Sequence, residues 1–268
     1  MSVIRQVFRF YINSSIHVAL AVCAFTASTY EILNLPFAEN LLFFVFFGTI
    51  TGYNFVKYAG IAQLHHRSLT STLQIIQIFS LLCFACCLYY AFQLSWNVLL
   101  ACIPLGFLTV FYAVPLFPSK ENLRTTPTLK IFVIAAVWAG TTVYLPKVTY
   151  GLGWNLEIIA LLLQRFFIVL ALIIPFEIRD LAFDDKNLAT LPQLIGIKRT
   201  KILGYFLLIM ALGVSFLGNQ EGNWLVLAIL ILLTGLAIFF SERRQNEYYT
   251  SFWVEGIPIC YWLALWLI

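Results

Sequence analysis

The chain contains nine long apolar segments that follow one another at short intervals. Each is close to the ~20 residues that an α-helix needs to cross the hydrocarbon core of a bilayer. Because a chain in lipid must satisfy its backbone hydrogen bonds internally, such segments are expected to be helical. They predict an all-α membrane protein with nine transmembrane helices in a single domain, residues 1–268. The approximate bounds are Tyr11–Leu33, Pro36–Tyr58, Thr72–Phe92, Trp96–Phe117, Leu129–Leu145, Leu156–Ile178, Ile202–Leu217, Trp224–Phe240 and Phe252–Ile268.

The composition argues against a soluble protein. Of the 268 residues, 62% are hydrophobic and only 10% are charged, whereas soluble domains carry about 25% charged residues. The net charge of +4 is too small to indicate a nucleic-acid partner. The six cysteines lie in apolar runs without histidines at ligand spacing, so we interpret them as small buried hydrophobic residues.

The basic residues predict the orientation in the membrane. If the amino terminus is cytoplasmic, every Lys and Arg except Lys147 and Arg165 falls on the cytoplasmic side. Positively charged loops are retained on that side. We therefore expect a multi-pass protein of the inner membrane whose amino terminus is cytoplasmic and whose carboxyl terminus is outside. Its long polar loops, and any site that they build, would face the cytoplasm.

One cytoplasmic stretch carries an unusual density of charge for so apolar a chain. It reads IIPFEIRDLAFDDKNLATLPQLIG, from Ile173 to Gly196, and includes Glu177, Asp180 and Asp184. Charge at the end of a hydrophobic segment is costly unless it has a role. If the helix continues past the membrane edge, these three carboxylates share one face, because residues three and four apart are neighbours on a helix. The stretch therefore predicts a site for a hard divalent cation.

Two other inner loops supply cations and amides. The loop after the second segment, GYNFVKYAGIAQLHHRSLTS, contains Asn54, Lys57, Tyr58 and Arg67, and the loop after the fourth segment ends at Lys130. Together the three loops place carboxylates and cations above an apolar interior. That combination suits a lipid diphosphate, because its head binds metal ions and cations while its tail lies among the helices.

The chain resembles the UbiA superfamily of intramembrane aromatic prenyltransferases, which have nine transmembrane helices and acidic motifs after helices 2 and 6. The family's second motif, DxxxD, is matched by Asp180 and Asp184 within IRDLAFDDKN, and the sequences TLPQLIGIKRTK and PTLK are also similar. The first motif, NxxxDxxxD, departs from the pattern. The register that keeps Asn54 places Tyr58 and Ala62 at the two aspartate positions.

The resemblance implies transfer of a prenyl group from an isoprenoid diphosphate to a lipophilic acceptor, aromatic or quinone-like. It also implies that Asp180 and Asp184 bind Mg²⁺. The alternative is a catalytically degenerate homologue that binds an isoprenoid or quinone, or scaffolds a partner, because the first motif lacks its aspartates. The side chains expected to contact the diphosphate or to complete the opposite wall are Asn54, Lys57, Tyr58, Arg67, Lys130, Arg179 and Lys186.

Four further charged residues lie outside these motifs. Two of them have two interpretations each, and the other two have only a structural one. Arg165 lies midway along an apolar segment, so we expect it to point into the bundle, where it either binds substrate or pairs internally. Glu255 begins the last segment and either orients an acceptor hydroxyl or lies at the membrane interface. Arg243 and Arg244 are interpreted as anchors at the inner membrane surface.

Overall fold

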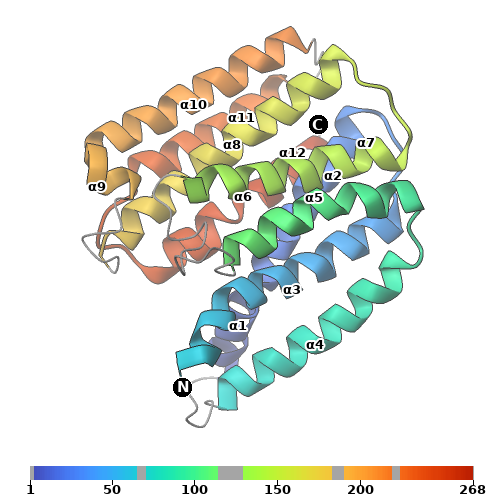
Figure 1. The fold of residues 1–268 in the computed structure, drawn as a ribbon. Helices are drawn as coiled ribbons and strands as arrows, with labels where there is room; N and C mark the ends of the chain where they lie inside the picture. The colour runs from blue at the N-terminus through green and yellow to red at the C-terminus, as the bar shows by residue number, and fades with distance from the viewer. Residues whose placement is uncertain (1–2, 65–70, 114–128, 183–189, 219–223, 268) are drawn as a thin grey trace.

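The computed structural model describes residues 3–64, 71–113, 129–182, 190–218 and 224–267 (Figure 1). Within these ranges every regular element is a helix, which confirms the all-α prediction. The elements are α1 (Val3–Asn13), α2 (Ile16–Ile32), α3 (Glu39–Leu64), α4 (Ser71–Ala91), α5 (Trp96–Ala113), α6 (Leu129–Ala139), η1 (Gly140–Tyr144), α7 (Leu145–Thr149), α8 (Leu156–Asp180), α9 (Leu191–Ile195), α10 (Ile197–Leu217), α11 (Trp224–Phe239), η2 (Tyr249–Val254) and α12 (Ile257–Leu267).

Each of the nine predicted segments falls on a helical part of the described chain, but not all of them are long enough to span a bilayer alone. Six stretches pass on length and hydropathy, and a bent pair at the amino-terminal end makes a seventh if it counts as one span. Helix α11 has 16 residues and α12 has 11. The count of nine transmembrane helices therefore stays a prediction. The six stretches are Glu39–Tyr58, Leu73–Ala91, Trp96–Ala113, Leu129–Thr149, Leu156–Asp180 and Ile197–Leu217.

The first predicted segment is not a continuous helix, contrary to the sequence interpretation. Helix α1 ends at Asn13, and α2 starts at Ile16 at an angle of 54° to it. Ser15 at the break has a φ of 63°, in the left-handed region. Asn and Ser compete with the helix for backbone hydrogen bonds, which explains why the chain breaks at this sequence.

The hydrophobic core is centred on α8, which packs against α6, α10 and α11 (Figure 1). Arg165 of this helix is 1% exposed, so the expectation that it points into the bundle is confirmed. Its guanidinium lies 4.0 Å from the centroid of the Phe25 ring, and its Nη2 donates a hydrogen bond to Ser28 Oγ at 3.0 Å. These contacts favour internal pairing with α2 over substrate binding.

The amino-terminal and carboxyl-terminal parts of the described chain are packed together. Helix α2 contacts α12 along its length, and His17 Nε2 forms a hydrogen bond of 2.8 Å with the Phe252 carbonyl oxygen. The Phe252 ring stacks on His17 and contacts Phe8 of α1 edge-on. Helices α1 and α2 therefore fix the position of η2, the π-helical turn that precedes Glu255.

Candidate functional site

A polar pocket of about 460 Å³ opens between α3, α6, α8 and the turn before α12. Four of its lining residues are ionisable and come from three separate parts of the chain. Aromatic side chains from α3, α5, α6 and α8 form much of the remaining wall. The ionisable residues are Lys130, Glu177, Asp180 and Glu255, and the aromatic residues are Tyr53, Tyr112, Trp138 and Phe176.

Helix α8 brings Glu177 and Asp180 to this pocket from one face, as their spacing of three residues predicts. The helix does not continue through the acidic stretch, however. It ends at Asp180, and Leu181 and Ala182 form a turn. The helix therefore extends two residues past the predicted bound of Ile178 and brings Glu177 and Asp180 to one face, whereas Asp184 lies outside the described residues.

Lys130 and Glu177 form an ion pair across the pocket wall. Lys130 Nζ lies 2.8 Å from Glu177 Oε1, and the Glu177 side chain is 5% exposed. A carboxylate buried to this extent is costly without a compensating cation. The pair therefore fixes the start of α6 against the end of α8. It also holds Lys130, a predicted phosphate contact, at the pocket wall.

Arg179 binds its neighbour Asp180. Its Nε and Nη2 lie 2.8 Å and 2.7 Å from Asp180 Oδ1, and its Nη1 donates a hydrogen bond of 2.6 Å to Thr250 Oγ1. The guanidinium also lies 5.3 Å from the Phe176 ring centroid. Arg179 thus couples the end of α8 to η2 and neutralises a carboxylate that the sequence assigned to a metal ion.

Glu255 lies in the polar pocket rather than at the periphery of the protein. It sits in the turn between η2 and α12, near enough to Lys57 and Arg179 to interact with their charges electrostatically. A carboxylate in a low-dielectric pocket requires a hydrogen bond or a cation. Of the two interpretations of Glu255, its position favours contact with a bound molecule. The adjoining Gly256 and Pro258 in the sequence mark a turn, but only the fold places that turn beside α8.

The α3 residues that were predicted to contact substrate instead form hydrogen bonds with other parts of the chain. Asn54 is 3% exposed; its Oδ1 accepts a hydrogen bond from Ser15 Oγ at 2.8 Å, and its Nδ2 donates to the Ser14 carbonyl oxygen at 3.0 Å and to Ser80 Oγ at 2.7 Å. Asn54 therefore holds the break between α1 and α2.

Lys57 and Tyr58 also bind the end of α1. Lys57 Nζ and Tyr58 Oη donate hydrogen bonds of 3.3 Å and 2.9 Å to the Asn13 carbonyl oxygen. None of Asn54, Lys57 and Tyr58 is among the residues that line the polar pocket. The other predicted contacts, Arg67 and Lys186, lie outside the described residues.

A second polar pocket, of about 560 Å³, adjoins the end of α8. It is lined by Arg179 and Asp180 together with Arg243 and Arg244, which follow α11. From the sequence, these last two arginines are expected to be membrane anchors only. Their position beside Asp180 adds two cations to this edge of the site. The sequence feature that could have indicated this is that both arginines fall on the same predicted side of the membrane as the acidic stretch.

The polar pocket has oxygen donors of the kind that Mg²⁺ binds. The described residues contain no group of three or more His, Cys, Asp or Glu side chains placed to hold a metal ion. Mg²⁺ sites nevertheless commonly use one or two carboxylates together with substrate phosphates and water. Asp180, which lines this cavity, is a carboxylate that fits that type of donor set.

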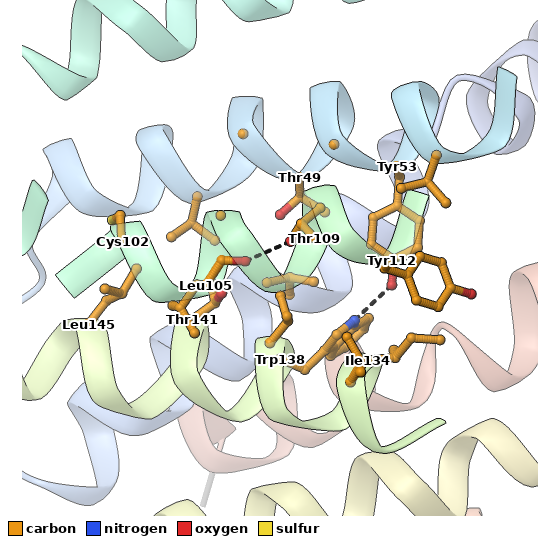
Figure 2. A pocket seen from close by; sticks show the side chains of 18 of the residues that line it. Thr49, Tyr53, Cys102, Leu105, Thr109, Tyr112, Ile134, Trp138, Thr141 and Leu145 are labelled. Carbon is orange, nitrogen blue, oxygen red and sulfur yellow. Dashed lines mark hydrogen bonds between the residues drawn. The ribbon is translucent and has the colours of Figure 1, made fainter. Parts of the chain in front are cut away.

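An apolar pocket of about 320 Å³ lies between α3, α5 and α6 (Figure 2), beside the polar one. The two pockets share Tyr53, Tyr112, Ile134 and Trp138 as lining residues. Trp138 Nε1 donates a hydrogen bond of 2.7 Å to Tyr53 Oη, as Figure 2 shows. The polar pocket and the apolar pocket are thus neighbours, and the aromatic side chains of Tyr53, Tyr112 and Trp138 form the boundary between them.

Comparisons with known proteins identify the fold. No protein-family model matches the sequence, and no curated protein matches it. Among solved structures, a UbiA homologue from Archaeoglobus fulgidus bound to DMAPP and Mg²⁺ is similar over 97% of this chain and 99% of that one, with a TM-score of 0.64 at 14% identity. The same homologue bound to GPP and Mg²⁺ gives a TM-score of 0.62 at 14% identity, again over 97% and 99% of the two chains.

A digeranylgeranylglyceryl phosphate synthase is also similar, over 98% of both chains, with a TM-score of 0.58 at 16% identity. Likeness at these identities concerns the fold. The resemblance to UbiA prenyltransferases that the sequence indicated is therefore confirmed for the architecture of nearly the whole chain.

Proposed function

We propose that this chain, which has the fold of the UbiA homologues, is a membrane prenyltransferase that uses an isoprenoid diphosphate as donor. The acceptor would be a lipophilic molecule, aromatic or quinone-like. The observation that carries the proposal is the junction of a charged pocket with an apolar one inside the helical bundle. A diphosphate head and a hydrocarbon tail require that pairing of environments. Structures with the same fold are bound to DMAPP or GPP with Mg²⁺.

The diphosphate would lie at the cytoplasmic end of α8. Asp180, with Asp184 of the following segment, would hold Mg²⁺, which neutralises charge on the departing diphosphate. Arg179 and Lys130 already face this region and would exchange their present carboxylate partners for phosphate oxygens. Lys186 and Arg67 would add cations from their loops. Lys57 is close enough to act electrostatically, whereas Asn54 and Tyr58 would support this wall by fixing α1.

The reaction breaks the bond between the prenyl carbon and the diphosphate oxygen, and its electron pair leaves with the diphosphate. A new bond then forms between that carbon and the acceptor, which loses a proton. Aromatic faces attract the positive charge that develops on the prenyl carbon. Tyr53, Trp138 and Phe176 line the pocket where it would develop, and their bulk excludes water that would quench it. Glu255 would orient the acceptor hydroxyl and accept its proton.

The proposed orientation keeps these groups on the cytoplasmic side of the inner membrane. Its basis is the distribution of Lys and Arg along the sequence. In the described structure, Asp180 lines both polar pockets; Lys130 lines the first, and Arg179, Arg243 and Arg244 line the second. A soluble diphosphate headgroup would then reach the site from the cytoplasm, and the tail would enter the bundle.

The test is thermal stabilisation of the detergent-purified protein by non-hydrolysable prenyl thiolodiphosphates, with and without Mg²⁺. A ligand that binds only the folded state raises the melting temperature. We expect Mg²⁺-dependent stabilisation in the wild type, its loss in Asp180→Asn, and its retention in Glu242→Gln, an exposed carboxylate that lines neither polar pocket. No stabilisation by prenyl analogues of any length would refute the proposal.

A second candidate function is binding or scaffolding without catalysis. The observation that favours it is the use of Asn54, Lys57 and Tyr58 in hydrogen bonds to the chain itself. A catalytically inactive binder would show the Mg²⁺-dependent stabilisation but no release of pyrophosphate with any acceptor tried. Tyr58→Asp together with Ala62→Asp provides the discriminating variant, because a dormant enzyme would gain turnover from restored carboxylates and a binding protein would not.

A further inference from the structure

The apolar pocket owes its open space to glycines that face it from two helices. Gly48 and Gly52 lie one turn apart on α3, and Gly106 lies on α5. A Cβ atom built on Gly52 or on Gly106 would meet no atom within 4 Å, and one on Gly48 would meet only Cys87 Sγ, at 3.4 Å. A side chain at Gly52 or Gly106 would therefore extend into open space, whereas one at Gly48 would approach Cys87 of α4.

The pocket leads directly away from the proposed headgroup site. Its lining runs along α3 from Tyr53, at the boundary with the polar pocket, to Phe44, nine positions earlier. At the rise of an α-helix this is roughly 13 Å of depth into the bundle. The walls are almost entirely apolar, and the threonine of α5 among them is hydrogen-bonded to its own helix. Its Thr109 Oγ1 donates to the Leu105 carbonyl oxygen (Figure 2).

The boundary between the two pockets is formed by aromatic side chains. Tyr53 and Trp138 are hydrogen-bonded to each other, and the Tyr112 side chain lies beside them (Figure 2). Gly52 is the residue next to Tyr53 on α3 and lines the apolar side of this boundary. A tail that passes the aromatic pair therefore meets the bare backbone of Gly52 first, and that of Gly48 one helical turn deeper.

We infer that Gly52 is a specificity-determining residue: its missing side chain admits the distal carbons of a long isoprenoid chain into the apolar pocket. This inference rests on the proposed function and names the donor class as a diphosphate with a multi-unit prenyl chain. Each methylene buried in the pocket strengthens binding roughly four-fold. A side chain that occupies the pocket beyond Tyr53 therefore weakens binding of long chains and leaves the shortest donor unaffected.

The discriminating variant is Gly52→Leu, and the matched control is Gly213→Leu. Gly213 also has no atom within 4 Å of a Cβ, but it lies on α10 and lines neither the apolar nor the polar pocket. Both changes replace a helical glycine with a better helix former, so neither is expected to impair folding. Affinities for dimethylallyl and geranylgeranyl thiolodiphosphate are measured by thermal-shift titration with Mg²⁺ on the full chain.

We expect Gly52→Leu to lower the affinity for the geranylgeranyl analogue at least ten-fold and to change that for the dimethylallyl analogue less than two-fold. Gly213→Leu should change neither. Unchanged geranylgeranyl binding in Gly52→Leu, or an equal loss for both analogues, would overturn the inference while the proposed function stands. A wild type stabilised by neither analogue would overturn the proposed function and this inference with it.

Discussion

The carboxyl-terminal ends of α3 and α8 carry the two polar sequences that the family resemblance treats as halves of one site, yet the side chains of the two sequences have different contacts. At the end of α8, Glu177 and Asp180 line a cavity. At the end of α3, Asn54 and Tyr58 are bound to the residues around the α1–α2 break. Polarity at a helix end is therefore not sufficient evidence of a site, because a polar side chain can be fully occupied in holding the chain's own backbone.

The strongest test of this difference is the ion pair on the α8 side. Glu177→Gln would leave Lys130 partly buried without its carboxylate, and breaking a buried pair of this kind costs about 3–5 kcal/mol. We expect a marked drop in melting temperature. The double variant Glu177→Gln/Lys130→Met should recover much of the lost stability, since replacing both partners removes the uncompensated charge. Additive losses in the double variant would show that the two residues act independently.

On the α3 side, Asn54→Leu is expected to cost about 2–4 kcal/mol of unfolding free energy, because it removes the partner of the Ser14 carbonyl and of the Ser15 and Ser80 hydroxyls. The exposed Asn97 of α5 provides the control, Asn97→Leu. Prenyl thiolodiphosphates with Mg²⁺ should still raise the melting temperature of Asn54→Leu by the wild-type increment. Loss of that increment in a variant that remains folded would place Asn54 in the binding site and remove the contrast between the two helices.

Tyr53 is the exception on α3, because it lies one residue from Asn54 and faces the pockets. Tyr53→Phe would leave Trp138 Nε1 without its acceptor, at a cost of about 1–2 kcal/mol. The ring stays in place, so ligand-induced stabilisation should persist. Melting curves with and without the geranyl analogue check both statements. A full loss of ligand binding would mean that the hydroxyl, and not only the ring, contacts the ligand.

The smallest effect is expected from Lys57→Met. Its hydrogen bond to the Asn13 carbonyl oxygen is long, at 3.3 Å, and exposed, and exposed charged contacts contribute about 0–1 kcal/mol. The melting temperature should change little. Isothermal titration of the geranyl analogue should show less than a three-fold change in affinity at 0.15 M salt, because solvent screens a charge outside the pocket. A ten-fold loss would instead indicate direct phosphate contact.

Much of the fold was predictable because apolar segments in a bilayer have one backbone solution, the helix. The break at Ser14 and Ser15 was not recognised, since a run of three polar residues is compatible with a continuous helix until its partners are known. Asp180 and Lys130 line the polar pocket, and their roles in binding stay predictions. Glu255 has two interpretations from the sequence alone, and the α3 residues Asn54, Lys57 and Tyr58 were assigned to substrate binding although they bind the chain itself. Helical periodicity fixes a face of a helix but not the neighbour that this face meets.

The contact between His17 and Phe252 joins residues 235 positions apart, and it has a consequence for biogenesis. Chains are synthesised from the amino terminus, and long-range contacts form late. While α3 to α11 fold, α2 lacks its neighbour α12 and the polar pocket lacks the wall that carries Glu255. The pocket is therefore completed only when η2 and α12 dock. Until then, its charged side chains are open toward the side that η2 will cover.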